Sequence, residues 1–191
     1  MRNPRFGPLP RNLPNLITMA RLLAVPVIVW LILGGRYQSA FWLFVAAGVS
    51  DAVDGVLAKR FGMATALGAY LDPIADKALL IGVYLTLGAA NQIADWIVIL
   101  VVFRDLLILG GVVVGQMLGI GTAVQPIMIS KLNTLAQIVL AASAMGLLAF
   151  RLDGGPALDI LQAFVAATTV VSGLAYLYRW VSGASQGGQG Q

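Results

Sequence analysis

Long apolar runs alternate with short polar or glycine-rich breaks along the chain. A helix that crosses a bilayer needs about 20 mostly apolar residues, and six runs reach that length. They cover roughly residues 13–34, 39–58, 69–90, 94–118, 131–150 and 157–180. The pattern predicts an all-α integral membrane protein with six transmembrane helices. These form one domain, 13–181, between an N-terminal segment, 1–12, and a flexible Gly/Gln-rich tail, 182–191.

The first apolar run has an alternative interpretation as a secretory signal peptide, because a basic segment precedes it. Leu16 to Leu33 is longer than the apolar region of a usual signal peptide, and no A-x-A cleavage site follows it. We therefore expect this run to be retained as the first span.

Composition supports the membrane interpretation. Hydrophobic residues make up 59% of the chain and charged residues 10%, against about 25% charged in a soluble domain. The chain has no cysteine, which excludes disulfides and thiolate chemistry, and no histidine, which removes the commonest general base and transition-metal ligand. The net charge of +4 comes from Lys and Arg at segment ends, so it indicates topology and not nucleic-acid binding.

Basic residues concentrate in alternate loops, which predicts the orientation. With the N-terminus inside, the outer loops hold only Arg36 and Arg151. The cytoplasmic segments then hold Arg2, Arg5, Arg11, Lys59, Arg60, Lys131 and Arg179. The excess of inner charge predicts that both termini are cytoplasmic, in what we expect to be a bacterial inner membrane.

Four of the eight Asp residues fall in SDAVDGVLAKRFGMATALGAYLDPIADK, residues 50–77. Asp51 and Asp54 lie near the inner end of the second span, and Asp72 and Asp76 near the inner end of the third. The turn AKRFGMAT joins these two spans, so we expect them to pack as antiparallel neighbours with their Asp pairs facing each other. Spacings of three and four put each pair on one helix face, in the cytoplasmic third of the bilayer. Four carboxylates at this depth must be neutralised by protons or cations. Hard divalent ions such as Mg²⁺ prefer oxygen ligands, so the cluster suits two cations and a phosphate-bearing ligand.

The pattern D-x2-D-G-x2-A-K-x8-G-x3-D-x3-D, from Asp51 to Asp76, closely resembles the signature of the CDP-alcohol phosphatidyltransferase family, except that Lys59 stands where Arg is usual. The resemblance implies transfer of a phosphatidyl group from CDP-diacylglycerol to an alcohol, with release of CMP. It implies two cations, Mg²⁺ or Mn²⁺, on Asp51, Asp54, Asp72 and Asp76, with Asp76 also as general base. The CDP contacts that it implies are Asp51, Asp54, Gly55, Ala58, Lys59, Asn15 and Thr18, with Gly68 as a packing glycine of the site.

The resemblance also implies an acceptor pocket formed by Arg104, Lys131, Asn133 and Arg21. Family members that make phosphatidylglycerophosphate commonly carry a second Lys where this chain has Asn133. One cation fewer favours the diester phosphatidylglycerol, although Asn133 can also be a neutral change facing lipid or water. Residues 126–145 and 161–180 resemble family members that join CDP-diacylglycerol to phosphatidylglycerol, giving cardiolipin and CMP. Glycerol 3-phosphate remains the alternative acceptor, and the resemblance implies a homodimer in the lipid bilayer.

Two other classes of membrane protein also merit consideration. An ion or proton transporter buries Asp residues too, but usually shows internal repeats and polar residues at several depths. This chain has its Asp cluster at one depth and no internal repeat. A structural lipid-packing protein has no use for four carboxylates at metal-binding spacing.

Overall fold

The computed structural model describes the backbone of residues 13–61, 66–117 and 128–187, and the side chains of 16–51, 74–111 and 128–179. These residues form six helices and no strand. The helices are α1 (Leu13–Leu33), α2 (Tyr37–Phe61), α3 (Ala66–Ala89), α4 (Asp95–Met117), α5 (Met128–Phe150) and α6 (Gly155–Gly187). The prediction of an all-helical chain with six helices is therefore confirmed, with bounds within a few residues of those expected from the apolar runs.

Two boundaries differ from the sequence prediction. Helix α2 extends to Phe61, so Lys59 and Arg60 belong to the helix and not to the turn after it. Helix α6 extends to Gly187, into the segment 182–191 that the sequence predicts to be a flexible tail. Each residue added to an existing helix gains one backbone hydrogen bond, which offsets the low helix propensity of Ser182, Gly183 and Ser185.

The described turns share one way of ending a helix. Gly35, Asn91 and Arg151 have positive φ of 69°, 56° and 54°. After each, the next residue donates its N–H to a carbonyl five positions back, at 2.8 to 2.9 Å. This pattern is the Schellman motif, which satisfies the last carbonyls of a helix. The chain therefore reverses tightly at residues 34–36, 90–94 and 151–154, and consecutive helices run antiparallel.

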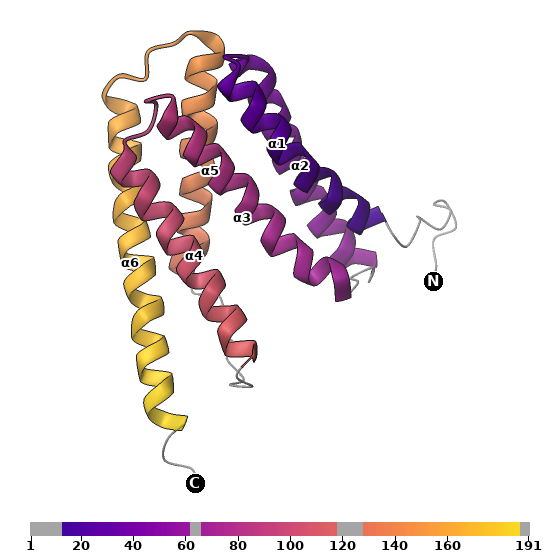
Figure 1. Cartoon of the computed structure of the whole chain (residues 1–191), viewed down its shortest axis with the longest axis vertical. Coiled ribbons are helices and arrows are strands. Elements are labelled where there is room, and N and C mark those ends of the chain that lie inside the picture. Colours follow the sequence, from indigo (N-terminus) through magenta and orange to yellow (C-terminus); the bar gives the residue numbers. More distant parts are fainter. Residues whose placement is uncertain (1–12, 62–65, 118–127, 188–191) are drawn as a thin grey trace.

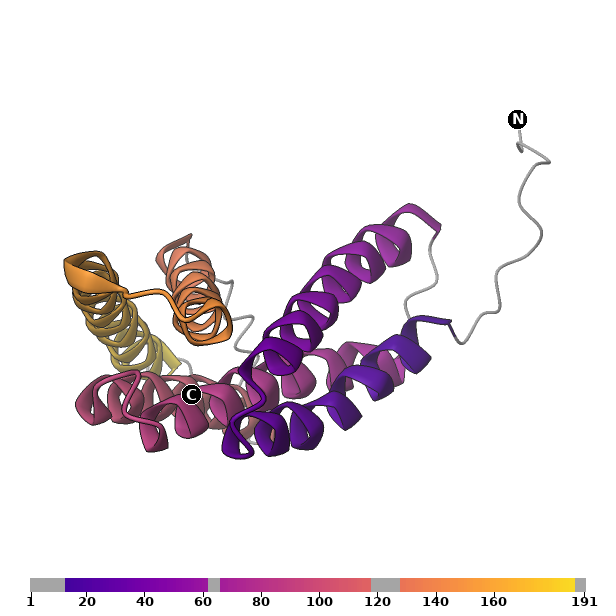
Figure 2. The same ribbon diagram turned by 90° about the horizontal axis from the view of Figure 1, so that it is seen from above.

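The helices form two layers of three. One layer contains α1, α3 and α4 in that order, and the other contains α2, α5 and α6 (Figure 2). Across the layers α1 packs on α2, α3 on α5 and α4 on α6. The first and last described residues lie at the same end of the bundle, and the three turns lie at the opposite end (Figure 1). We call these ends the terminal end and the turn end.

Among the described residues, three segments are long and apolar enough to cross a membrane: Leu16–Leu33, Met128–Phe150 and Gly155–Arg179. They belong to α1, α5 and α6. Large apolar side chains such as Leu23, Phe103 and Ile160 point outward and are more than half exposed. A surface of this kind is typical of helices that contact lipid.

The apolar core lies towards the turn end. It includes Ile32 of α1, Tyr84 and Leu87 of α3, Ile97 of α4 and Leu140 of α5, each almost fully buried. The polar residues of the interior follow in the half of the bundle nearer the terminal end, and they define the candidate site.

Candidate active site

The charged residues of the bundle interior come from four helices and form two groups. Arg21 of α1 joins Asp51 of α2 to Asp76 of α3. Lys77 of α3 and Arg104 of α4 both pair with Asp105 of α4. Because Asp76 and Lys77 are consecutive on α3, the two groups adjoin.

Arg21 holds the first group together. Its Nη2 lies 2.6 Å from Oδ1 of Asp51, and its Nη1 lies 2.5 Å from Oδ1 of Asp76. The Arg21 side chain is 2% exposed, whereas both carboxylate side chains are nearly half exposed. One buried guanidinium therefore bridges two accessible carboxylates from different helices, because its two terminal nitrogens can each meet a separate partner.

This arrangement corrects one sequence expectation. The sequence predicts that α2 and α3 pack against each other as antiparallel neighbours, with their Asp pairs facing directly. In the described part of the chain α2 does not contact α3, and α1 packs against both. Asp51 and Asp76 approach through Arg21, because the first helix of the chain occupies the position beside the second and the third.

The remaining members of the predicted cluster are described by their backbone alone. Asp54 lies three residues after Asp51 in α2, and Asp72 lies four residues before Asp76 in α3, so each shares a helix face with its described partner. The structure also describes only the backbone of Asn15, Gly55, Ala58, Lys59 and Gly68. Thr18 is buried on α1.

The described side chains include no group of three or more potential metal ligands. The side chains of Asp54 and Asp72 are not among those described. The described donors still fit a hard divalent cation. Asp51 and Asp76 offer accessible carboxylate oxygens that already approach one cationic group, and carboxylate oxygen is the ligand type that Mg²⁺ and Mn²⁺ prefer.

The second group ties four helices together, α3, α4, α5 and α6. Arg104 donates through Nη1 to Oδ1 of Asp105 at 2.7 Å, and through Nη2 to the hydroxyls of Ser130 on α5 and Ser172 on α6, both at 2.5 Å. Lys77 donates to the other oxygen of Asp105, at 2.6 Å. The Asp105 side chain is completely buried. The sequence alone identified Arg104, but gave no signal that Ser130, beside Lys131 at the start of α5, and Ser172, within an apolar stretch of α6, are its partners.

Asn133 lies in the interior and does not face lipid or water, so that alternative interpretation is wrong. Its side chain is fully buried, and Oδ1 accepts hydrogen bonds from the hydroxyls of Thr168 and Thr169 on α6, each at 2.9 Å. It therefore fastens α5 to α6. Lys131, two positions earlier, is exposed near the start of α5.

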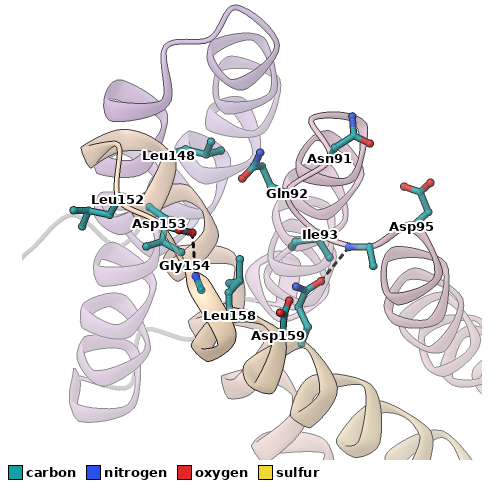
Figure 3. Close-up of a pocket in the computed structure, with 14 residues that line it drawn as sticks. Asn91, Gln92, Ile93, Asp95, Leu148, Leu152, Asp153, Gly154, Leu158 and Asp159 are labelled. Atoms are coloured by element: carbon teal, nitrogen blue, oxygen red, sulfur yellow. Dashed lines mark hydrogen bonds between the residues drawn. The ribbon is translucent and has the colours of Figure 1, made fainter.

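A cavity of about 640 Å³ lies at the turn end, between the turn that joins α3 to α4 and the turn that joins α5 to α6 (Figure 3). Asp95, Asp153 and Asp159 line it, and Gln162 accepts a hydrogen bond from the Ala94 N–H at 3.1 Å. Its three carboxylates disfavour an anionic nucleotide. It is also remote from the ion-paired carboxylates, since Asp95 and Asp105 lie about 15 Å apart along α4.

Comparison with known proteins identifies the family. The family model of CDP-alcohol phosphatidyltransferase matches residues 11–177, which is most of the chain. The chain belongs to the CDP-alcohol phosphatidyltransferase family. The match includes every ion-paired residue described above, and it confirms the resemblance drawn from the Asp pattern.

Similar curated proteins carry two kinds of name. A probable phosphatidylglycerophosphate synthase of Mycobacterium tuberculosis is 36% identical over 177 residues, covering 88% of this chain and 81% of that protein. The human cardiolipin synthase (CMP-forming) is 29% identical over 185 residues, covering 88% and 62%. A chloroplastic CDP-diacylglycerol–glycerol-3-phosphate 3-phosphatidyltransferase of rice is 34% identical, covering 86% and 56%. The chain thus spans little more than half the length of the rice and human relatives.

Proposed function

We propose that the protein acts in phospholipid biosynthesis and transfers the phosphatidyl group of CDP-diacylglycerol to phosphatidylglycerol, giving cardiolipin and CMP. The observation that carries this proposal is the meeting of Asp51 and Asp76 at Arg21, since both carboxylates belong to the family's Asp pattern and come from different helices. The human relative is named for this reaction. Glycerol 3-phosphate is the second candidate acceptor, favoured by the names and higher identities of the mycobacterial and rice relatives.

In this proposal Asp51, Asp54, Asp72 and Asp76 hold two divalent cations, which draw charge from the phosphoryl oxygens when bound. Asp76 accepts the proton of the acceptor hydroxyl, whose oxygen bonds to the β-phosphorus of the donor, while the bond from that phosphorus to the oxygen of CMP breaks. Arg21 keeps the Asp51 and Asp76 carboxylates at fixed positions. Gly55, Ala58, Lys59, Asn15 and Thr18 bind the CDP part of the donor.

The acceptor side of the site consists of Arg21, Arg104, Lys131 and Asn133 in this proposal. Asn133 contributes by holding α5 against α6, because its carbonyl oxygen is already taken by two threonine hydroxyls. The absence of a second Lys at position 133 is therefore a weaker guide to the acceptor than the sequence alone suggested.

We also propose that all six helices cross the membrane with both termini in the cytoplasm, and that the active site opens to that side. Three exposed tryptophans support the placement: Trp30 near the end of α1, Trp42 near the start of α2 and Trp96 at the start of α4. All three lie at the turn end, and Arg36 stacks on the Trp30 ring with its guanidinium carbon 5.1 Å from the centroid. Such aromatic belts mark the interface between lipid and water. A homodimer in a bacterial inner membrane completes the proposal.

The test uses purified protein in detergent with CDP-diacylglycerol and Mn²⁺. Labelled phosphatidylglycerol and labelled glycerol 3-phosphate are supplied in parallel reactions. Cardiolipin from the first reaction alone is the expected outcome. Product from glycerol 3-phosphate alone identifies glycerol 3-phosphate as the acceptor and leaves the rest of the proposed mechanism unchanged. Absence of CMP release with either acceptor, in the presence of Mn²⁺ or Mg²⁺, refutes the proposed function.

A further inference from the structure

We propose that Lys77, held in place by Asp105, is the cation that binds the phosphate of the acceptor alcohol. This inference rests on the proposed function and adds a residue to it. Lys77 lies in an apolar helix, where a long Lys side chain ordinarily extends to the membrane surface. In the structure it turns inward, with Nζ 2.6 Å from Oδ2 of Asp105, and remains 20% exposed.

The charges of this group are unequal. Lys77 and Arg104 share the single carboxylate of Asp105, so the group has an excess of one positive charge. The compensating carboxylate belongs to the adjoining group of Arg21, Asp51 and Asp76, so the positive excess is local to Lys77 and Arg104. A local excess of positive charge in a protein interior favours an anionic ligand.

Of the two cations, Lys77 is the one that a ligand can reach. The terminal nitrogens of Arg104 are engaged with Asp105, Ser130 and Ser172, and its side chain is 3% exposed. Arg104 therefore fixes the carboxylate of Asp105 and joins α4 to α5 and α6. Asp105 in turn positions Lys77.

The position of Lys77 also suits the chemistry of both candidate acceptors. In phosphatidylglycerol and in glycerol 3-phosphate, the attacking hydroxyl and the phosphate stand on one three-carbon glycerol unit. Asp76, the proposed base for that hydroxyl, immediately precedes Lys77 on α3. Asp76 pairs with Arg21 of α1 and Lys77 pairs with Asp105 of α4, so the two side chains leave α3 about 100° apart. We infer that the glycerol unit of an acceptor spans this step, with its hydroxyl at Asp76 and its phosphate at the ammonium group of Lys77, a compact donor to phosphate oxygens.

The test compares Lys77→Gln with the wild type in the CMP-release assay. Removing one charged contact should raise the KM of the acceptor at least about tenfold, while the KM of CDP-diacylglycerol stays within about twofold. Lys77→Arg should restore most of the acceptor affinity. Arg151→Gln, which removes an exposed charge at the turn end, should leave both constants unchanged and serves as the matched control.

A binding measurement separates this inference from the proposed function, because it needs no turnover. Glycerol 3-phosphate, or phosphatidylglycerol added to the detergent, should raise the melting temperature of the wild type and of Arg151→Gln, but not that of Lys77→Gln. An unchanged acceptor KM in Lys77→Gln, or equal stabilisation of this variant by the ligand, overturns the inference. A rise in the KM of CDP-diacylglycerol alone also overturns it, since Lys77 then serves the donor.

Discussion

With the helices crossing the membrane as proposed, the three tryptophans at the turn end predict the depth of the ion-paired charges in the bilayer. Arg21 lies nine positions from Trp30 on α1. Asp51 lies nine positions from Trp42 on α2, and Asp105 nine positions from Trp96 on α4. At 1.5 Å per residue, each charge lies about 13.5 Å along its helix from an interfacial ring. Half of a hydrocarbon core is about 15 Å thick, so these charges should lie close to the midplane, deeper than the cytoplasmic third expected from the sequence. Asp54 and Asp72 are nearer the terminal end, and therefore in the cytoplasmic half.

Single-tryptophan variants measure this depth. The chain has four tryptophans, so three of them are replaced by Phe in each variant, leaving Trp30, Trp42 or Trp96. The proteins are reconstituted in vesicles of phosphatidylcholine brominated at shallow or deep acyl positions. We expect each of the three to be quenched most strongly by shallow bromines, because the rings belong at the lipid–water interface.

Leu106→Trp, in a chain with no other tryptophan, is the matched control. Leu106 is exposed on α4 and lies ten residues beyond Trp96, or about 15 Å along the helix. This tryptophan should be quenched most strongly by deep bromines. Deep quenching of Trp42 or Trp96, or quenching of either by aqueous iodide without any effect of bromolipid, contradicts the proposed crossing of α2 and α4.

Three further variants test the site. Asp76→Asn should abolish CMP release, while the dissociation constant of CDP-diacylglycerol, measured by calorimetry, should stay within a few fold of the wild-type value. Turnover at the wild-type rate would show that Asp76 is not the base. Arg104→Met leaves Asp105 paired with Lys77 alone and breaks the ties to α5 and α6, so unfolding in detergent should be easier by about 3 kcal/mol; an unchanged denaturation midpoint contradicts that role. Asn133→Lys places a charge beside two buried hydroxyls and should destabilise by about 2 kcal/mol without changing the ratio of acceptor rates; a shift of that ratio towards glycerol 3-phosphate restores the charge-counting interpretation.

The helices and the Asp pairs were predictable from sequence because both are local properties. An apolar run of about 20 residues has few alternatives to a helix once water is excluded, since each backbone polar group then needs a partner within its own segment. The spacing of Asp72 and Asp76 likewise defines a shared helix face. These predictions depend on residues within a few turns of one another.

The arrangement of helices around the site was not predictable in the same way. Sequence neighbours usually pack together, which led to the wrong expectation that α2 contacts α3. The two-by-three array places α1 against both, and only then does Arg21 reach Asp51 and Asp76. Asn133 illustrates the same limit, because the direction of one polar residue in an apolar helix depends on partners on another helix, here Thr168 and Thr169.

The pairing of charges also explains how strongly charged helices fit a membrane bundle. Most of the ion-paired charges are on α2, α3 and α4, in helices that are otherwise apolar. A charge facing lipid costs several kcal/mol, but one paired inside a bundle avoids most of this cost. The described ion pairs contain three cations and three carboxylates, so they balance as a set. The charged residues of these helices are therefore those that assemble the site, and their pairing lowers the cost of the proposed membrane crossing.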